Sequence, residues 1–87
     1  DSILGSNVNL GAGVKLSNLR NDGQPIGIWF DDVRRETGLR KFGAILGDDV
    51  QLGCNAVTNP GTILGKSSMV HPNTTVSGYH SNGSVLR

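Results

Sequence analysis

The chain is poor in several residue types, and each shortage excludes a class of protein. It has one cysteine among 87 residues, so no internal disulfide can form and a reducing, cytoplasmic setting is expected. Eight basic and seven acidic residues give a net charge of +1, which supplies no general attraction for nucleic acid or an anionic membrane. The longest apolar run is three residues, far below the roughly 18 that cross a bilayer. We therefore expect one small domain with neither nucleic acid nor a membrane as partner.

Glycine and proline are abundant, with 13 and 3 residues, and they recur with a period of six. The six-residue segments, called hexads below, begin with Leu or Val in every case but Thr58, and the phase is kept on both sides of an interruption at residues 22–39. The first positions are Leu4, Leu10, Leu16, Leu46, Leu52, Thr58, Leu64, Val70 and Val76. Fifth positions are small or β-branched, except for Arg20. A short period of this kind is typical of a repeat fold.

The hexads predict an all-β fold, a single-stranded parallel β-helix of about three coils. Three short strands of six residues form each coil, and the side chains at first and fifth positions point into a narrow interior. A period of six matches neither the 3.6-residue period of an α-helix nor the two-residue alternation of hairpins. Glycine, frequent at the second position, is expected to supply corner torsions that other residues resist.

The interruption at residues 22–39, called the arm below, is expected to leave the β-helix at a corner. It is read as two short strands around Asp31 and Asp32, and Trp29 and Phe30 argue against disorder. We expect the arm to lie against the wall of the β-helix or against a neighbouring subunit; the alternative is that it merely packs on its own coil. Four basic residues cluster at its exit: Arg34, Arg35, Arg40 and Lys41. They form either a solvated face or a site for the phosphate of a sugar or cofactor.

The stretches Gly11–Arg20, Thr37–Asp48 and Gly53–Thr62 resemble the C-terminal domain of sugar-1-phosphate nucleotidyltransferases, including amino-sugar-1-phosphate acetyltransferases. The resemblance covers nearly the whole chain. It implies a left-handed coil, acetyl-CoA as cosubstrate, an amino sugar 1-phosphate as acceptor, and a homotrimer with active sites between neighbours. It also implies that residues 1–87 are one β-helix domain of a longer chain with an upstream nucleotide-transferring domain.

The resemblance also suggests binding residues. Asn18 matches a sugar-site asparagine, and with it we assign Arg40 and Lys41 to the sugar phosphate. Cys54 and Pro72 fall where contacts to the acetyl-CoA arm are expected. The alternatives are structural: Asn18 turns the chain out of the coil with a left-handed torsion, and Cys54 is a small corner residue rather than a nucleophile.

No catalytic residue is assigned within the chain. The general-base histidine of the resembling proteins would precede Asp1, and Gln24 stands where the acetylating members have a phosphate-binding lysine. The chain alone is therefore expected to lack acetyltransferase activity. His71 is expected to be solvated and His80 to cap the coil, and two histidines do not complete a three-histidine metal site. The alternative function is a noncatalytic module for trimerisation or regulation.

Overall fold

The computed structural model describes residues 1–30 and 33–87, and within these ranges every regular element is a β-strand. The strands are β1 (Ile3–Leu4), β2 (Asn9–Leu10), β3 (Lys15–Leu16), β4 (Gly27–Phe30), β5 (Val33–Glu36), β6 (Ile45–Leu46), β7 (Gln51–Leu52), β8 (Val57–Thr58), β9 (Ile63–Leu64), β10 (Met69–Val70), β11 (Thr75–Val76), β12 (Tyr79–His80) and β13 (Val85–Leu86). None of the described residues forms a helix that is long and apolar enough to cross a membrane.

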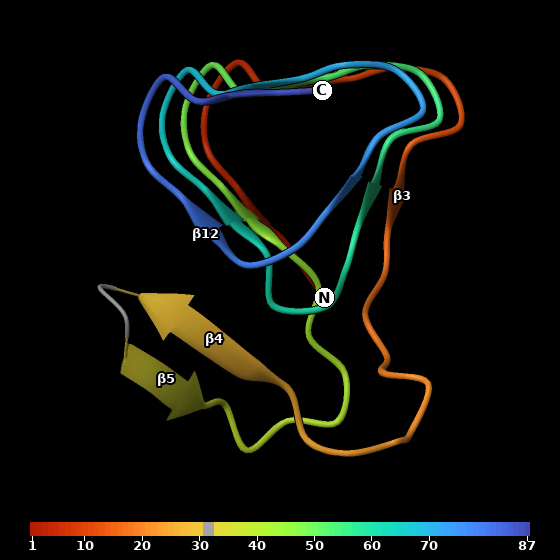
Figure 1. Ribbon diagram of the computed structural model, residues 1–87, viewed down its shortest axis with the longest axis vertical. Coiled ribbons are helices and arrows are strands. Elements are labelled where there is room, and N and C mark those ends of the chain that lie inside the picture. The colour runs from red at the N-terminus through yellow and green to blue at the C-terminus, as the bar shows by residue number, and fades with distance from the viewer. Residues whose placement is uncertain (31–32) are drawn as a thin grey trace.

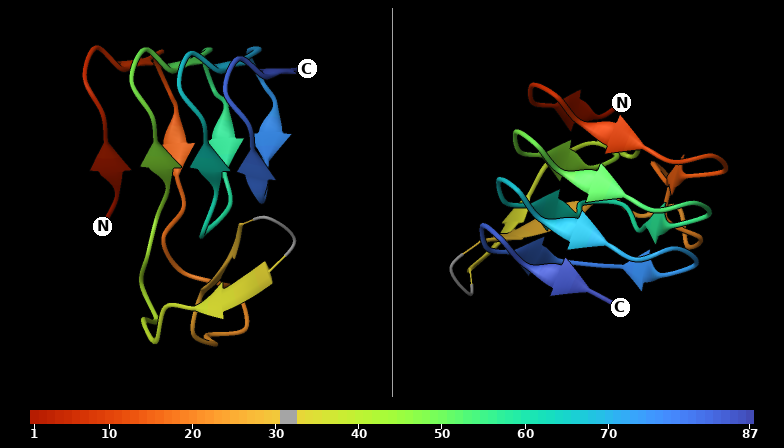
Figure 2. Two further views of the ribbon diagram at one scale, coloured as in Figure 1. Left: turned by 90° about the vertical axis from the view of Figure 1, so that its left-hand side faces the viewer. Right: turned by 90° about the horizontal axis from the view of Figure 1, so that it is seen from above.

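Eleven of the strands form the three walls of a left-handed parallel β-helix, called the prism below (Figure 1; Figure 2). The first face has the order β1-β6-β9-β12, the second β2-β7-β10-β13 and the third β3-β8-β11. Successive coils stack in parallel register, with Leu46 beside Leu64 and Leu52 beside Val70. The predicted fold class is confirmed, including the 18-residue coil that these pairs define.

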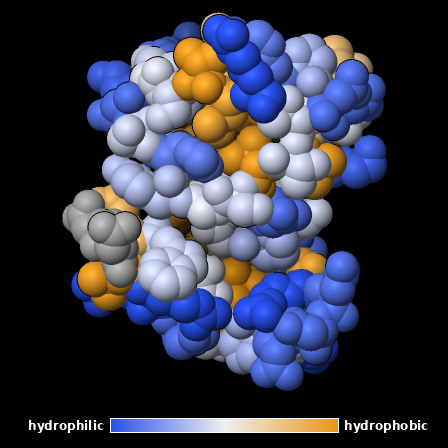
Figure 3. Space-filling model, viewed as in Figure 1, coloured by the Kyte–Doolittle hydropathy of each residue, from blue (hydrophilic) through white to orange (hydrophobic). Residues whose placement is uncertain are grey.

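The interior of the prism contains the first and fifth positions of the hexads. Leu46, Leu52, Leu64 and Val70 are each 1% exposed, and the fifth-position Val50 is fully buried. Leu4 and Leu10 are 45% and 39% exposed, because they lie in the first coil and only one side of it is covered by a described coil. Viewed along the axis, apolar surface shows inside the triangular outline, bordered by polar residues (Figure 3). The inward assignment of the repeat is therefore confirmed.

The corners correct one prediction about glycine. The non-glycine residues with positive φ all occupy the fourth position of the hexad, where Asn7, Asp49, Asn55, Ser67 and Asn73 have φ of 60 to 62°. Asparagine and aspartate tolerate this conformation better than most residues. The second-position glycines instead allow close stacking: a β-carbon on Gly47 would lie 2.7 Å from the backbone nitrogen of Lys66 in the next coil. Glycine at the second position is thus required by contact between coils and not by a corner torsion.

The arm is an antiparallel hairpin of β4 and β5, as predicted (Figure 1). The isolated bridge between Leu19 and Lys41 closes its base. The end of β4 contacts the last coil of the same chain, where the rings of Phe30 and Tyr79 pack edge to face with their centroids 4.9 Å apart. Asp31 and Asp32, the predicted turn, lie outside the described residues. Within one chain, the arm therefore packs against its own prism.

Candidate functional site

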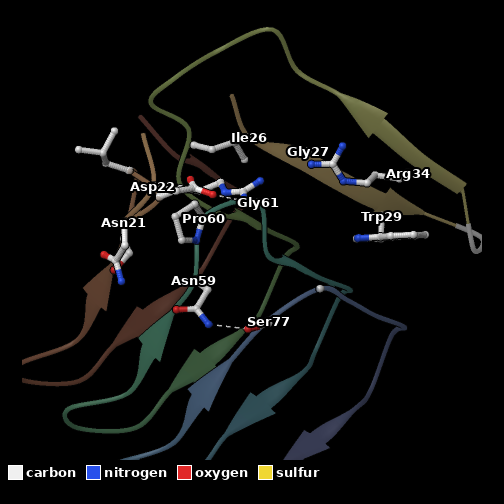
Figure 4. Close-up of a pocket in the computed structure, with 14 residues that line it drawn as sticks. Asn21, Asp22, Ile26, Gly27, Trp29, Arg34, Asn59, Pro60, Gly61 and Ser77 are labelled. Carbon is white, nitrogen blue, oxygen red and sulfur yellow. Dashed lines mark hydrogen bonds and ion pairs between the residues drawn. The ribbon is translucent and has the colours of Figure 1, made fainter. Parts of the chain in front are cut away.

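A cavity lies between the arm and the corner of the prism that joins the third face to the first. This space, called the arm cleft below, has a volume of about 590 Å³. One wall comes from the hairpin, a second from the chain that leads into it, and a third from the corners of two stacked coils (Figure 4). Ligand sites for small molecules usually span about 300 to 1,000 Å³. The arm cleft is therefore large enough for a small metabolite.

The hairpin wall presents Trp29 and Arg34, which are directly opposite each other in the antiparallel register. Residues paired in this way project from the same face of the sheet. The guanidinium of Arg34 lies over Gly27, where a β-carbon would approach its Nη2 to 2.5 Å. Arg34 also forms an ion pair with Glu36 on its own strand. Any side chain at position 27 would therefore displace the arginine from this wall.

The second wall contains an ion pair between Arg20 and Asp22, with Nη2 and Oδ2 2.6 Å apart. The backbone N–H of Gln24 donates to the other oxygen of Asp22 at 3.1 Å. This backbone hydrogen bond lowers the pKa of Asp22 below its usual value, and the Arg20 hydrogen bond and charge lower it further. The carboxylate is therefore ionised at neutral pH, which keeps Arg20 oriented at the cleft.

The prism wall is a ladder of second-position residues on the third face: Ser17, Asn59 and Ser77. The Asn59 side-chain amide donates to the Ser77 hydroxyl at 2.5 Å (Figure 4). Behind the ladder, buried Gly61 approaches the arm so closely that a β-carbon there would lie 2.5 Å from the Gly27 carbonyl oxygen. The hairpin is thus seated against a neutral, hydrogen-bonding wall.

The predicted substrate residues gather at the base of the arm, outside the arm cleft. Asn18 donates from its side chain to Asp1 at 2.7 Å, and its carbonyl accepts the Phe42 N–H at 2.8 Å. Its φ is not positive, so the alternative of a left-handed turn residue is wrong. Lys41 is exposed beside Leu19, and Arg40 is exposed near Gly23. None of Asn18, Arg40 and Lys41 lines the cleft.

The predicted cofactor residues Cys54 and Pro72 lie in register at one corner of adjacent coils. Both occupy the third position of their hexads, and the first positions of these two hexads, Leu52 and Val70, are paired in register. Both residues are exposed. Beside them, a groove of about 220 Å³ crosses the second face, lined by Pro72, Met69 and His71 among others. The structure therefore brings Cys54 and Pro72 together on the outer surface, and Pro72 reaches the groove directly.

The two histidines lie apart in the prism, His71 directly after β10 and His80 on β12. The side chain of His71 is exposed. The imidazole Nε2 of His80 lies 2.8 Å from the Ser77 carbonyl oxygen. Within residues 1–30 and 33–87, no group of three potential metal ligands comes together. The histidines therefore offer no shared site.

Sequence reasoning did not assign Arg20, Trp29 or Asn59 to a site, and it placed Arg34 only within a cluster of four basic residues offered as a candidate phosphate site. A signal was present for one of them, since Arg20 is the single charged residue among the fifth positions that otherwise fill the interior. Arg34 was grouped with other basic residues but not separated from Arg35. Only the hairpin register distinguishes them, because Arg34 pairs with Trp29 and Arg35 with Ile28.

The fold and its hexads define a hexapeptide-repeat protein of the left-handed β-helix type, and comparisons with known proteins narrow this class. No family model matches the chain. Relatives include a bifunctional sugar-1-phosphate nucleotidylyltransferase/acetyltransferase of Sulfurisphaera tokodaii, 34% identical over 77 residues. They also include the bifunctional protein GlmU of Methanococcus vannielii, 36% identical over 76 residues. A putative uncharacterized acetyltransferase, YaiX of Escherichia coli, is 32% identical over 76 residues.

These matches cover most of this chain and little of the first two relatives. They span 88% and 87% of this chain but 19% and 18% of those two proteins, and 33% of YaiX. The chain thus spans about a fifth of the length of its bifunctional relatives. The chain is similar to the hexapeptide-repeat part of sugar-1-phosphate nucleotidyltransferase/acetyltransferases, which confirms the resemblance. It is an acyltransferase-like β-helix domain.

Proposed function

We propose that the chain is the acyl-transfer part of a protein that uses acetyl-CoA to acetylate an amino sugar 1-phosphate. The observation that supports this most directly is the homology over 88% of the chain to a protein named as a sugar-1-phosphate nucleotidylyltransferase/acetyltransferase. Neither histidine is assigned as the catalytic base, because no hydrogen bond joins His71 or His80 to another side chain within the described residues. The protein acts in the cytoplasm, where acetyl-CoA is available.

The groove on the second face fits the thioester arm of acetyl-CoA. Met69 and Pro72 supply exposed apolar surface for the methylene groups of that arm. At the corner beside the groove, the register stacks the small or compact residues Ala12, Cys54 and Pro72. By contrast, the corner between the first and second faces uses Asp48 and Asn82 to accept backbone N–H groups from the preceding coil, at 2.7 and 2.9 Å. Cys54 and Pro72 therefore leave room along the outer surface for a long cosubstrate.

Isothermal titration of the full chain with acetyl-CoA tests this assignment. We expect binding with a micromolar constant, and we expect Met69→Trp to weaken it by about tenfold or more, because the larger side chain fills the groove. Thr75→Trp is the matched control, since Thr75 also points outward on the same coil but does not line the groove. Binding that is unchanged by Met69→Trp would place the thioester arm elsewhere, and no binding of acetyl-CoA would contradict the proposal.

A noncatalytic assembly module is the second candidate, and a ladder on the first face favours it. Its outward sixth-position residues are Ile3, Ile45, Ile63 and Tyr79, which stack in register on β1, β6, β9 and β12. Ile3 is 59% exposed and Tyr79 is 36% exposed. A contiguous apolar strip on an outer wall favours contact with another copy of the chain in a homotrimer.

Sedimentation equilibrium combined with the acetyl-CoA titration distinguishes the two candidates. If the chain acts only in assembly, it forms a stable trimer and does not bind acetyl-CoA. Ile63→Lys is expected to dissociate the trimer, because it places a charge within the apolar strip, whereas Thr75→Lys on the third face is expected to leave it intact. A monomer at all concentrations would eliminate the assembly role.

A further inference from the structure

The side chains that line the arm cleft suit a phosphorylated sugar. It combines one exposed aromatic ring, two arginines and a neutral hydrogen-bonding wall in a single space. The cleft is separate from Asn18, Arg40 and Lys41, the residues assigned to the sugar phosphate from the sequence. The cleft is therefore a second place for the acceptor, and its location is argued from the structure alone.

The two arginines provide the anion-binding part. Arg20 and Arg34 both line the cleft, whereas Asp22 is the single acidic side chain among its lining residues. Each arginine has one carboxylate partner on its own segment, Asp22 and Glu36 respectively. A guanidinium has five N–H donors and a carboxylate engages at most two in a bidentate pair, so each arginine keeps donors for a phosphate.

Trp29 provides the surface for the sugar ring. Its side chain is 49% exposed and lies across the hairpin from Arg34 (Figure 4). An indole face offers a flat apolar platform with one polar edge, which suits the apolar face of a pyranose. Because Trp29 and Arg34 are paired in the register, a ring on the indole would place an attached phosphate beside the guanidinium.

The prism wall supplies partners for hydroxyl groups. Asn59 donates to Ser77, which leaves the Asn59 amide oxygen as an acceptor and the Ser77 hydroxyl proton as a donor. These groups lie opposite the hairpin in Figure 4. The wall carries no charge among Ser17, Asn59 and Ser77, so it favours a polyhydroxylated ligand over a second anionic group.

We propose that the arm cleft binds a phosphorylated sugar, with its phosphate between Arg20 and Arg34 and its ring against Trp29. The choice of sugar phosphate as the ligand class rests on the proposed function, while the location rests on the cleft itself. The arm is then a binding element of the domain, and Gly27 and Gly61 are required because they let the arginine and the hairpin approach this closely.

Fluorescence of the full chain reports on this site directly, because Trp29 is the only tryptophan in the sequence. We expect glucosamine 1-phosphate to change the Trp29 emission at lower concentration than either glucosamine or inorganic phosphate. Arg34→Met is expected to weaken that response by about tenfold or more, since a hydrogen-bonded charge is lost. Arg34→Lys is expected to recover part of it, because the charge is kept without the bidentate geometry.

Arg35→Met is the matched control. Arg35 lies beside Arg34 on the same strand, pairs with Ile28 and does not line the cleft. Circular dichroism of each variant confirms that the prism is folded. An equal loss in Arg34→Met and Arg35→Met would mean a general effect of charge and would overturn the proposal. So would inorganic phosphate or glucosamine acting as strongly as glucosamine 1-phosphate, or no response to any of the three probes.

Titration of Arg34→Met with acetyl-CoA separates this proposal from the proposed function. The groove for acetyl-CoA lies on the second face and shares no lining residue with the arm cleft. We therefore expect Arg34→Met to bind acetyl-CoA normally. If the chain binds the sugar phosphate and not acetyl-CoA, the acyl-transfer assignment fails while the cleft stands; the reverse result leaves the acyl-transfer assignment and overturns the cleft.

Discussion

The prism and the arm use the same backbone in opposite ways. In the prism, each strand has two residues, one inward and one outward, and its stability depends on register between coils far apart in sequence. In the arm, four-residue strands pair with their immediate neighbour, and Trp29, Phe30 and Val33 are 46 to 49% exposed. The prism is stabilised by the repeated burial of inward side chains. The hairpin buries few side chains of its own and positions Trp29 and Arg34 beside the prism. The difference predicts that mutations in the two regions will change stability by unequal amounts.

The largest effect is expected in the prism interior. Leu52→Asp places an unpaired charge at a side chain that is 1% exposed, which costs several kcal/mol and should prevent folding. Far-ultraviolet circular dichroism and urea unfolding measure the result. Lys66→Glu, at an exposed corner position, is the control and should change stability by less than about 0.5 kcal/mol. A folded Leu52→Asp variant would contradict the inward assignment.

Glycine substitutions compare the two regions directly. Gly47→Ala would place a β-carbon 2.7 Å from a backbone nitrogen of the next coil, so the coils must shift, at a cost of about 1 to 3 kcal/mol. Gly38→Ala in the arm meets no atom within 4 Å and is affected only by its φ of +71°, about 1 kcal/mol. Urea denaturation of both variants should rank Gly47→Ala as the more damaging. The opposite order would show that coil spacing adapts more easily than the arm.

A pair of buried threonines gives a smaller effect with opposite signs. Within the described part of the chain, the Thr58 hydroxyl is buried without a hydrogen-bond partner, whereas the Thr62 hydroxyl donates to the Asn59 carbonyl at 2.7 Å. We expect Thr58→Val to stabilise the prism and Thr62→Val to destabilise it, each by about 1 kcal/mol. Thermal unfolding measures both changes. A loss of stability in Thr58→Val would reveal a hydroxyl partner, such as an internal water.

The smallest effect is expected when the pH is lowered and Asp22, at the base of the arm, becomes protonated. The folded pKa of Asp22 is below its unfolded value of 3.8, so its contribution to stability is complete above that value and is lost as pH falls through the folded pKa. The side chain is exposed, and we therefore expect a local change without unfolding of the prism. The amide resonance of Gln24, followed by NMR during an acid titration, should move in the native chain. Asp22→Asn should remove that shift; a shift that persists would exclude the Asp22 carboxylate as its cause.

Much of the fold could be predicted, because a six-residue period specifies which side chains point inward without any knowledge of distant contacts. Leu46, Leu52 and Leu64 follow from that rule alone, and the interrupted segment was correctly predicted to hold two short strands around Asp31 and Asp32. Left-handedness came from the resemblance. The role of the second-position glycines could not be predicted, since it depends on how closely Gly47 and Lys66 stack across the coil boundary.

The candidate site was the least predictable part. Ser17, Asn59 and Ser77 are 18 to 60 residues apart and meet only because whole coils stack in register. Arg34 and Arg35 are equivalent by composition, and the pairing partner alone decides which one faces the cleft.

The amino-acid sequence by itself determined the period, the inward and outward alternation, and the place where the repeat is interrupted, because these depend on neighbouring residues. Only the tertiary structure decided that the arm folds back on its own prism and that Arg20, Trp29 and Arg34 share one cleft. The reason is physical: the closeness of two segments depends on the stacking of the coils between them, which no local pattern encodes.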